Sequence, residues 1–211
     1  RIVRIGAPAG VQGMVFSFSN VCIQTAINGF GADAMAGSAA ALNFECFGYF
    51  VVSAFTQACT TFTSQNYGAH NFARCRRVFS QSFACGVLLN ALLCAVFIVF
   101  RAPFIAIYSP DEPVIAYGLV RMLHTLPFDW VMCLYEVSSG AMRGMGRSMT
   151  PALITIFGTC LFRLFWVFTV FVRWHSFAVL MSVYPVSWTL TGLLMMIAYF
   201  AVRQKATNRL H

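Results

Sequence analysis

The chain has 211 residues, of which 59% are hydrophobic and only 9% are charged, and its mean hydropathy is +0.74. Soluble domains carry about 25% charged residues, so this composition excludes an ordinary soluble domain and indicates a membrane protein. The net charge of +8 has two interpretations, nucleic-acid binding or Lys and Arg flanking membrane spans, and the positions of the basic residues distinguish them.

Six segments are long and apolar enough to cross a bilayer, which needs about 20 apolar residues per helix. They comprise residues 11–30, 36–63, 78–100, 114–141, 150–171 and 179–201. The sequence therefore predicts an all-α polytopic membrane protein in which residues 1–211 form one six-helix lobe. Because the chain begins with Arg1 instead of methionine, we expect a fragment of a longer protein.

The first span carries a stripe of polar residues. Ser17, Asn20, Gln24 and Asn28 are three or four residues apart, so they lie along one side of a helix. A side with this many polar groups does not face lipid. Either it forms interhelical hydrogen bonds or it lines a solute cavity, and the sequence leaves both alternatives open.

The second span contains Asn43 and Glu45 in its outer half. An ionisable group within a span is costly and survives beside a partner charge or a water-filled cavity. Glu45 and Arg163, in the fifth span, lie at similar depths below the outer ends of their helices, since each residue advances a helix by about 1.5 Å. We therefore expect a Glu45–Arg163 ion pair with a structural role.

The fourth span holds two further carboxylates, Asp129 and Glu136. At helical spacing they share one face, about 10 Å apart along the axis, and look into one interior. A transport role and an interhelical bond are both open for them, while Arg121 is expected to snorkel outward. Pro127 here, and Pro185 in the sixth span, each remove a backbone hydrogen bond and predict kinks.

Basic residues collect on one side of the predicted spans when the amino terminus is placed inside. The inner set is Arg1, Arg4, Arg74, Arg76, Arg77, Arg143, Arg147, Arg203, Lys205 and Arg209, and the outer set is Arg101 and Arg173. The positive-inside rule then predicts that both termini are cytoplasmic. The basic clusters are a sorting signal that also suits lipid head groups, and no nucleic-acid partner is expected.

The eight cysteines and four histidines show no metal-ligand spacing, and no two cysteines form a CxxC pair. Buried thiols are the better interpretation of the cysteines. No nucleophile and base form a reactive constellation, so neither a metal site nor an enzyme is expected.

Five segments carry a resemblance to a known family. They are RIGAPAGVQG (4–13), NFECFGYFVVSAFTQACTTFTSQNYGAHN (43–71), SSGAMRGMGRSMTP (138–151), FRLFWVF (162–168) and YPVSW (184–188). In this order they resemble the second half of multidrug and toxic compound extrusion (MATE) transporters, especially the bacterial DinF-like kind. The resemblance covers essentially the whole chain, and the QNYGA and GAMRG motifs make it specific.

The resemblance implies the carboxyl-terminal lobe of a two-lobe (6+6) transporter in the bacterial inner membrane. Such a transporter exports cationic or amphipathic compounds in exchange for H⁺ or Na⁺ by alternating access, without another cofactor. The implied partners are a small-molecule substrate, membrane lipid, and either the amino-terminal lobe or a second copy. The candidate residues for a cation, proton or substrate cavity are Glu45, Asp129, Glu136, Asn20, Gln24 and Asn43.

The first span departs from the family pattern, because some members place a cation-binding carboxylate there and this chain has Asn20 and Gln24. Glu45 and Glu136 resemble acids usual in the DinF-like group, whereas Asp129 is a candidate on physical grounds alone. Two alternatives stay open: a half-size transporter that pairs with itself, and a flippase for lipid-linked substrates of the same superfamily. A flippase is expected to have a more basic cavity.

Overall fold

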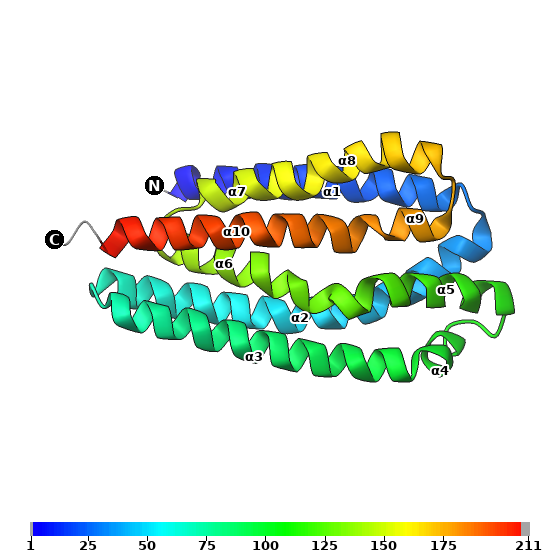
Figure 1. Ribbon diagram of the computed structural model, residues 1–211, viewed down its shortest axis with the longest axis horizontal. Coiled ribbons are helices and arrows are strands. Elements are labelled where there is room, and N and C mark those ends of the chain that lie inside the picture. Colours follow the sequence, from blue (N-terminus) through cyan, green and yellow to red (C-terminus); the bar gives the residue numbers. More distant parts are fainter. Residues whose placement is uncertain (1, 208–211) are drawn as a thin grey trace.

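The computed structural model describes the backbone of residues 2–207 and the side chains of residues 10–204. All regular elements in this part of the chain are helices, which run side by side along the long axis (Figure 1). The side chains of four residues in the charge count, Arg1, Arg4, Lys205 and Arg209, lie outside the described residues.

Several helices follow one another almost in line. The elements are α1 (Ile2–Asn28), α2 (Ala32–Gly68), α3 (Phe72–Val99), α4 (Arg101–Ala106), α5 (Glu112–Thr125), η1 (Leu126–Val131), α6 (Met132–Gly144), α7 (Met149–Thr155), η2 (Ile156–Leu161), α8 (Phe162–Trp166), η3 (Val167–Phe171), α9 (Phe177–Met181) and α10 (Val183–Thr207). Here η1 is a 3₁₀ helix, and η2 and η3 are π helices.

Among the described residues, four helical stretches are long and apolar enough to cross a membrane. These are Ala32–Gly68, Phe72–Val99, Met149–Phe171 and Phe177–Gln204. Four of the six expected spans therefore coincide with such stretches. For the other two, which fall in α1 and in the segment from α5 to α6, a membrane span stays a prediction.

The prolines explain where two helical segments change their geometry. Pro127 lacks an N–H and cannot complete the α-helical ladder, and the chain passes through the 3₁₀ helix η1 at this point. Pro185 lies in the first turn of α10, where no intrahelical partner is needed, directly after the interruption between α9 and α10 at Ser182. Both breaks fall within segments that the sequence predicts as single spans.

The helix α2 is central, because it packs against α3, α5 and α6. Two glycines of the GAMRG motif, Gly140 and Gly144, let α6 approach α2 closely. A Cβ at Gly140 would lie 2.7 Å from Thr60 Oγ1 and 2.9 Å from the Thr56 carbonyl oxygen. The motif is thus a small-residue helix contact of the GxxxG type. The turn that follows depends on Gly146, whose φ is +76°.

The α2–α3 turn, the α6–α7 turn, the first residues of α1 and the last residues of α10 lie at one end of the bundle (Figure 1). The basic residues Arg74, Arg76, Arg77, Arg143 and Arg147 are therefore gathered at that end. Arg101 lies in α4 and Arg173 lies between η3 and α9, so both belong to the opposite end. The described basic residues of the inner set thus lie at one end of the bundle, and which side of the membrane that end faces stays a prediction.

Replacing Gly140 by alanine should separate α6 from α2, because backbone and side-chain atoms of α2 occupy the space of the new methyl group. We expect a loss of about 1–3 kcal/mol in stability, as for other overpacked interiors. The measurement is the thermal unfolding midpoint of the full-length protein in detergent. The matched control is Gly86→Ala, where the nearest atom to the new Cβ lies at an ordinary 3.4 Å. Equal stability of both variants would contradict the close contact.

Candidate functional site

A buried ion pair joins α2 to α5. The Arg121 guanidinium donates from Nε to Glu45 Oε1 at 2.7 Å and from Nη2 to Glu45 Oε2 at 2.9 Å. Its Nη1 donates to Ser38 Oγ at 2.6 Å, and Thr125 Oγ1 donates to Glu45 Oε1 at 3.0 Å. Glu45 and Arg121 are 6% and 2% exposed, so this bidentate pair is almost completely removed from solvent and lipid.

The expected Glu45–Arg163 ion pair is therefore wrong, and so is the expectation that Arg121 snorkels outward. Arg121 lies nine residues after Glu112, the first residue of α5, so its depth in the bundle matches that of Glu45 equally well. The packing decides between the two arginines, because α2 packs against α5 whereas α8 packs against α1 and α10.

Arg163 lies in α8, between the two π helices, and is 1% exposed. Its Nη1 donates to Asn20 Oδ1 at 2.9 Å, and its Nε donates to Ser187 Oγ at 3.2 Å. Among the described residues no carboxylate pairs with it. Instead of a carboxylate, the Arg163 guanidinium contacts the neutral oxygens of Asn20 and Ser187. It also lies over the Phe16 ring, whose centroid is 5.4 Å from Arg163 Cζ.

The Tyr184 ring connects the two buried cations. Its centroid lies 4.8 Å from Arg163 Cζ and 5.3 Å from Arg121 Cζ. Because Tyr184 belongs to α10, the polar contacts form one continuous chain from α2 through α5, α10 and α8 to Asn20 on α1. Among its members, sequence reasoning gave no contact role to Ser38, Tyr184 or Ser187. It placed Thr125 on the polar face of its span, and the four-residue spacing of Arg121 and Thr125 was the available signal for a shared partner.

Asp129 lies in η1 and has no exposed surface. Its Oδ2 accepts from Asn90 Nδ2 at 3.0 Å and from Cys94 Sγ at 3.7 Å, both on α3. Its Oδ1 has no hydrogen-bond partner among the described residues. Gly48 on α2 completes the enclosure, because a Cβ there would overlap the carboxylate. Asp129 therefore lies inside the lobe and does not line an open face.

Glu136 is in a different setting from Asp129. It lies in α6, is half-buried, and has no hydrogen bond or ion pair within the described residues. Its charge acts on the exposed Tyr49 of α2, and Arg143 acts on Glu136 in turn. The 3₁₀ turns of η1 advance the chain by about 120° per residue instead of 100°. The two acids therefore do not form the shared group that uniform helical spacing predicts.

The remaining candidates divide between the interior and the surface. Asn20 is half-buried against Arg163, whereas Gln24 and Asn43 are exposed. Gln24 Nε2 donates to Asn28 Oδ1 at 3.0 Å, and Asn43 Nδ2 donates to the Ala39 carbonyl at 3.0 Å. The polar stripe of the first span thus supplies both an interhelical bond, through Asn20, and an exposed polar surface.

These surroundings determine what each acid can do. Glu45 is neutralised by its bidentate partner, so it is poorly suited to take up another cation. Asp129 offers one unoccupied oxygen in a closed space, and Glu136 is the acid with access to the surface. No group of three or more His, Cys, Asp or Glu side chains that could hold a metal ion occurs in the described part of the chain.

The chain is similar in sequence to a known protein family and to several bacterial proteins. The sequence model of the family described as MatE matches residues 8–169. The chain is 24% identical over 154 residues to the probable multidrug resistance protein NorM of Thermotoga maritima and 28% identical over 164 residues to the multidrug resistance protein PmpM of Pseudomonas aeruginosa. The alignments cover 73% and 74% of this chain and 33% of each relative.

The fold has close counterparts among solved structures. The MATE transporter VcmN of Vibrio cholerae, in its bent form, superposes with a TM-score of 0.87 at 17% identity. The superposition covers 97% of this chain and 47% of that one. The chain therefore spans about a third of the length of these curated relatives and just under half of this solved transporter.

The apolar helices and these matches define an all-α, multi-pass membrane protein. Since the family model matches most of its length, the chain belongs to the MatE family. It is thus assigned to a family of transporters and not of enzymes. The DinF-like subgroup stays a prediction.

Removing Arg121 should strongly destabilise the protein, because Glu45 would remain buried without its partner. For Arg121→Leu we expect a loss of about 3–5 kcal/mol, measured as a lower unfolding midpoint in detergent. Combining it with Glu45→Gln removes the unpaired charge and should restore part of the loss. The control is Arg173→Gln at an exposed position. A midpoint that Arg121→Leu leaves unchanged would refute a structural role for the pair.

Proposed function

We propose that this chain is the carboxyl-terminal lobe of an antiporter that exports cationic or amphipathic compounds in exchange for H⁺ or Na⁺. Membership of the MatE family and the likeness to half of a MATE transporter support this proposal. Residues 1–211 would form one lobe, with α1 and the α5–α6 segment completing six spans. A second lobe would enclose the substrate between the two, and alternating access would expose it to either side.

The observation that carries the proposal is a set of exposed amide side chains on α1 and α2. They are Gln24 and Asn28 on α1 and Asn43 and Gln57 on α2, and they lie among exposed apolar side chains such as Val21 and Phe50. Hydrocarbon disfavours polar groups that it cannot solvate, so this surface suits a water-filled cavity or a partner lobe better than lipid. Tyr49 is exposed on the same helix α2 and interacts electrostatically with Glu136.

Glu136 is the acid that we assign to exchange. A half-buried carboxylate beside a polar surface attracts a cationic substrate and also binds a proton or Na⁺. The substrate cation and the coupling ion compete for the same carboxylate, so binding of H⁺ or Na⁺ would weaken binding of the substrate and favour its release. We assign Glu45 to the structure of the lobe, and Asp129 to a protonatable or hydrogen-bonding role between α3 and η1.

The distribution of charge supports one orientation in the membrane. We infer that both termini are cytoplasmic and that the protein resides in the bacterial inner membrane, since the basic end of the bundle would then face the cytoplasm. Arg74, Arg76 and Arg77 at the α2–α3 turn supply the densest group of inner charges.

Glu136→Gln in the full-length protein should reduce export of a cationic dye by about tenfold, because a missing charge interaction of about 1.4 kcal/mol has that effect. The measurement is energised efflux from cells or proteoliposomes, normalised to protein in the membrane. Glu112→Gln, the same change in the exposed first turn of α5, should leave efflux unchanged. Unchanged efflux with Glu136→Gln would remove this residue from the mechanism.

The mass of the native polypeptide separates the lobe from a half-size transporter. We expect an intact mass of roughly twice 23.4 kDa for the protein purified from its own membrane. A 23.4 kDa product in a dimer would favour the self-pairing alternative. In that case the polar surface on α1 and α2 would face its own copy.

A further inference from the structure

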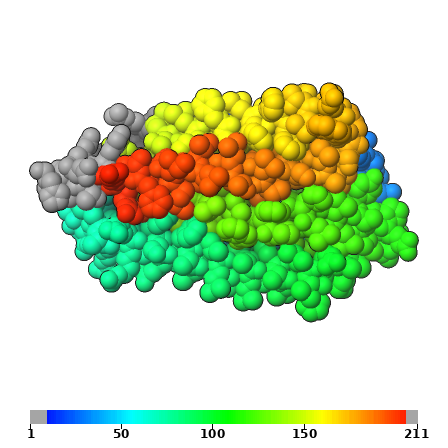
Figure 2. Space-filling model, viewed as in Figure 1, coloured from blue at the N-terminus to red at the C-terminus, as the bar shows by residue number. Residues whose placement is uncertain are grey.

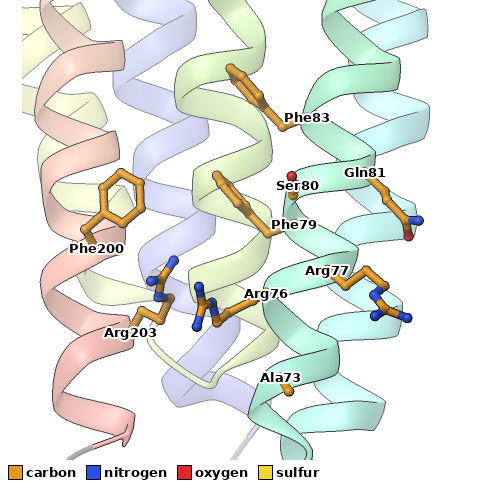
Figure 3. A pocket seen from close by; sticks show the side chains of 9 residues that line it. All are labelled: Ala73, Arg76, Arg77, Phe79, Ser80, Gln81, Phe83, Phe200 and Arg203. Atoms are coloured by element: carbon orange, nitrogen blue, oxygen red, sulfur yellow. The ribbon is translucent and has the colours of Figure 1, made fainter.

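We propose that the groove between α3 and α10, at the basic end of the bundle, binds the phosphate head group of an anionic phospholipid. The groove has a volume of about 550 Å³ and is lined by Ala73, Arg76, Arg77, Phe79, Ser80, Gln81, Phe83, Phe200 and Arg203 (Figure 3). This site lies apart from the acids discussed above and does not depend on the transport reaction. Its placement in the inner leaflet rests on the orientation proposed above.

The groove exists because α3 and α10 both pack against α6. A strip of α6 is visible between them on the surface (Figure 2). Phe79 of α3 stacks on Tyr199 of α10 with ring centroids 4.0 Å apart, which closes the groove beneath the surface. Phe83 and Phe200 extend along its two walls (Figure 3).

The charges of the groove suit an anion. Arg76 and Arg203 extend toward one another across it (Figure 3), and the Arg203 guanidinium also lies 5.3 Å from the Phe200 ring centroid. No Asp or Glu occurs anywhere in residues 46–110 or 137–211, the stretches that supply the lining. Arg76 therefore has no carboxyl side chain from these stretches beside it, and the planar donors of a guanidinium match phosphate oxygens.

The walls of the groove indicate that the anion belongs to a lipid. Beyond Phe83 and Phe200, the exposed side chains continue as an apolar surface toward the middle of the bundle, including Leu88 and Ile197 at 73% and 67% exposure. From Ala84 to Val99 every exposed side chain of α3 is apolar or a cysteine, so this surface suits acyl chains. A head group between guanidiniums with its chains on apolar residues matches the way basic pockets between membrane helices hold anionic lipids.

A second hollow on the other side of α3 provides the comparison that the experiment needs. Arg77 points away from Arg76 (Figure 3) and, with Arg74, lines a hollow of about 460 Å³ against α2. Arg74 and Arg147 are exposed at the same end of the bundle, and neither lines the α3–α10 groove. Replacing these two removes the same charge from the same membrane surface.

The test is native mass spectrometry of the full-length protein in detergent, titrated with phosphatidylglycerol or phosphatidylcholine of the same acyl chains. Wild type should retain phosphatidylglycerol preferentially. Arg76→Gln with Arg203→Gln should weaken the first binding event by about 25-fold, at about fivefold per basic residue near a head group. Arg74→Gln with Arg147→Gln should leave that event within about twofold of wild type.

Three results would overturn the proposal. They are equal retention of the two lipids by wild type, equal weakening by the two double variants, and full displacement of phosphatidylglycerol by inorganic phosphate, which would identify a site for free anions. If the groove double variant does not fold, the single exposed change Arg76→Gln carries the test. It should cost about fivefold, and an unchanged affinity would again reject the site.

Discussion

The buried Glu45–Arg121 ion pair is the interaction on which the arrangement of the helices depends. Charges taken out of water are tolerated only when their geometry is good and their remaining groups are satisfied. Both guanidinium–carboxylate bonds form here, and Ser38 and Thr125 occupy further positions around them. Since Tyr184 lies beside both Arg121 and Arg163, the contacts that fix α2 against α5 also position α10 and α8.

Composition and motifs predicted the class of the molecule well, because apolar length alone identifies helices that suit a bilayer. They did not predict which charges meet. Two arginines lie at the depth of Glu45, and hydropathy gives the depth of a residue without giving the neighbour of its helix. Only the packing of α2 against α5 selects Arg121. Arg163 is then left to neutral oxygens and aromatic rings, an outcome that charge counting does not anticipate.

The position of Asp129 shows a second limit of sequence reasoning. A uniform helical period places Asp129 and Glu136 on one face, yet the chain changes to 3₁₀ geometry at Pro127 and turns Asp129 toward Asn90. Pro127 was a visible signal for a break in the helix. The direction in which the Asp129 side chain then points depends on how many residues adopt the tighter 3₁₀ helix. Asn90, the one polar residue besides the cysteines in the apolar stretch from Phe83 to Val99, was the other available signal.

The exposed residues of α3 differ from those of α1 and α2, and the difference matters for a lobe that moves against a partner. On α3, every exposed residue from Ala84 to Val99 is apolar or a cysteine, which suits permanent contact with lipid. On α1 and α2, the amides of Gln24 and Asn43 bond within their own helices and still reach the surface. An amide that keeps a hydrogen bond within its own helix costs less free energy to desolvate when a second lobe covers it. It can bind water again when that lobe withdraws. A surface built in this way tolerates both states, as the proposed alternating access would require.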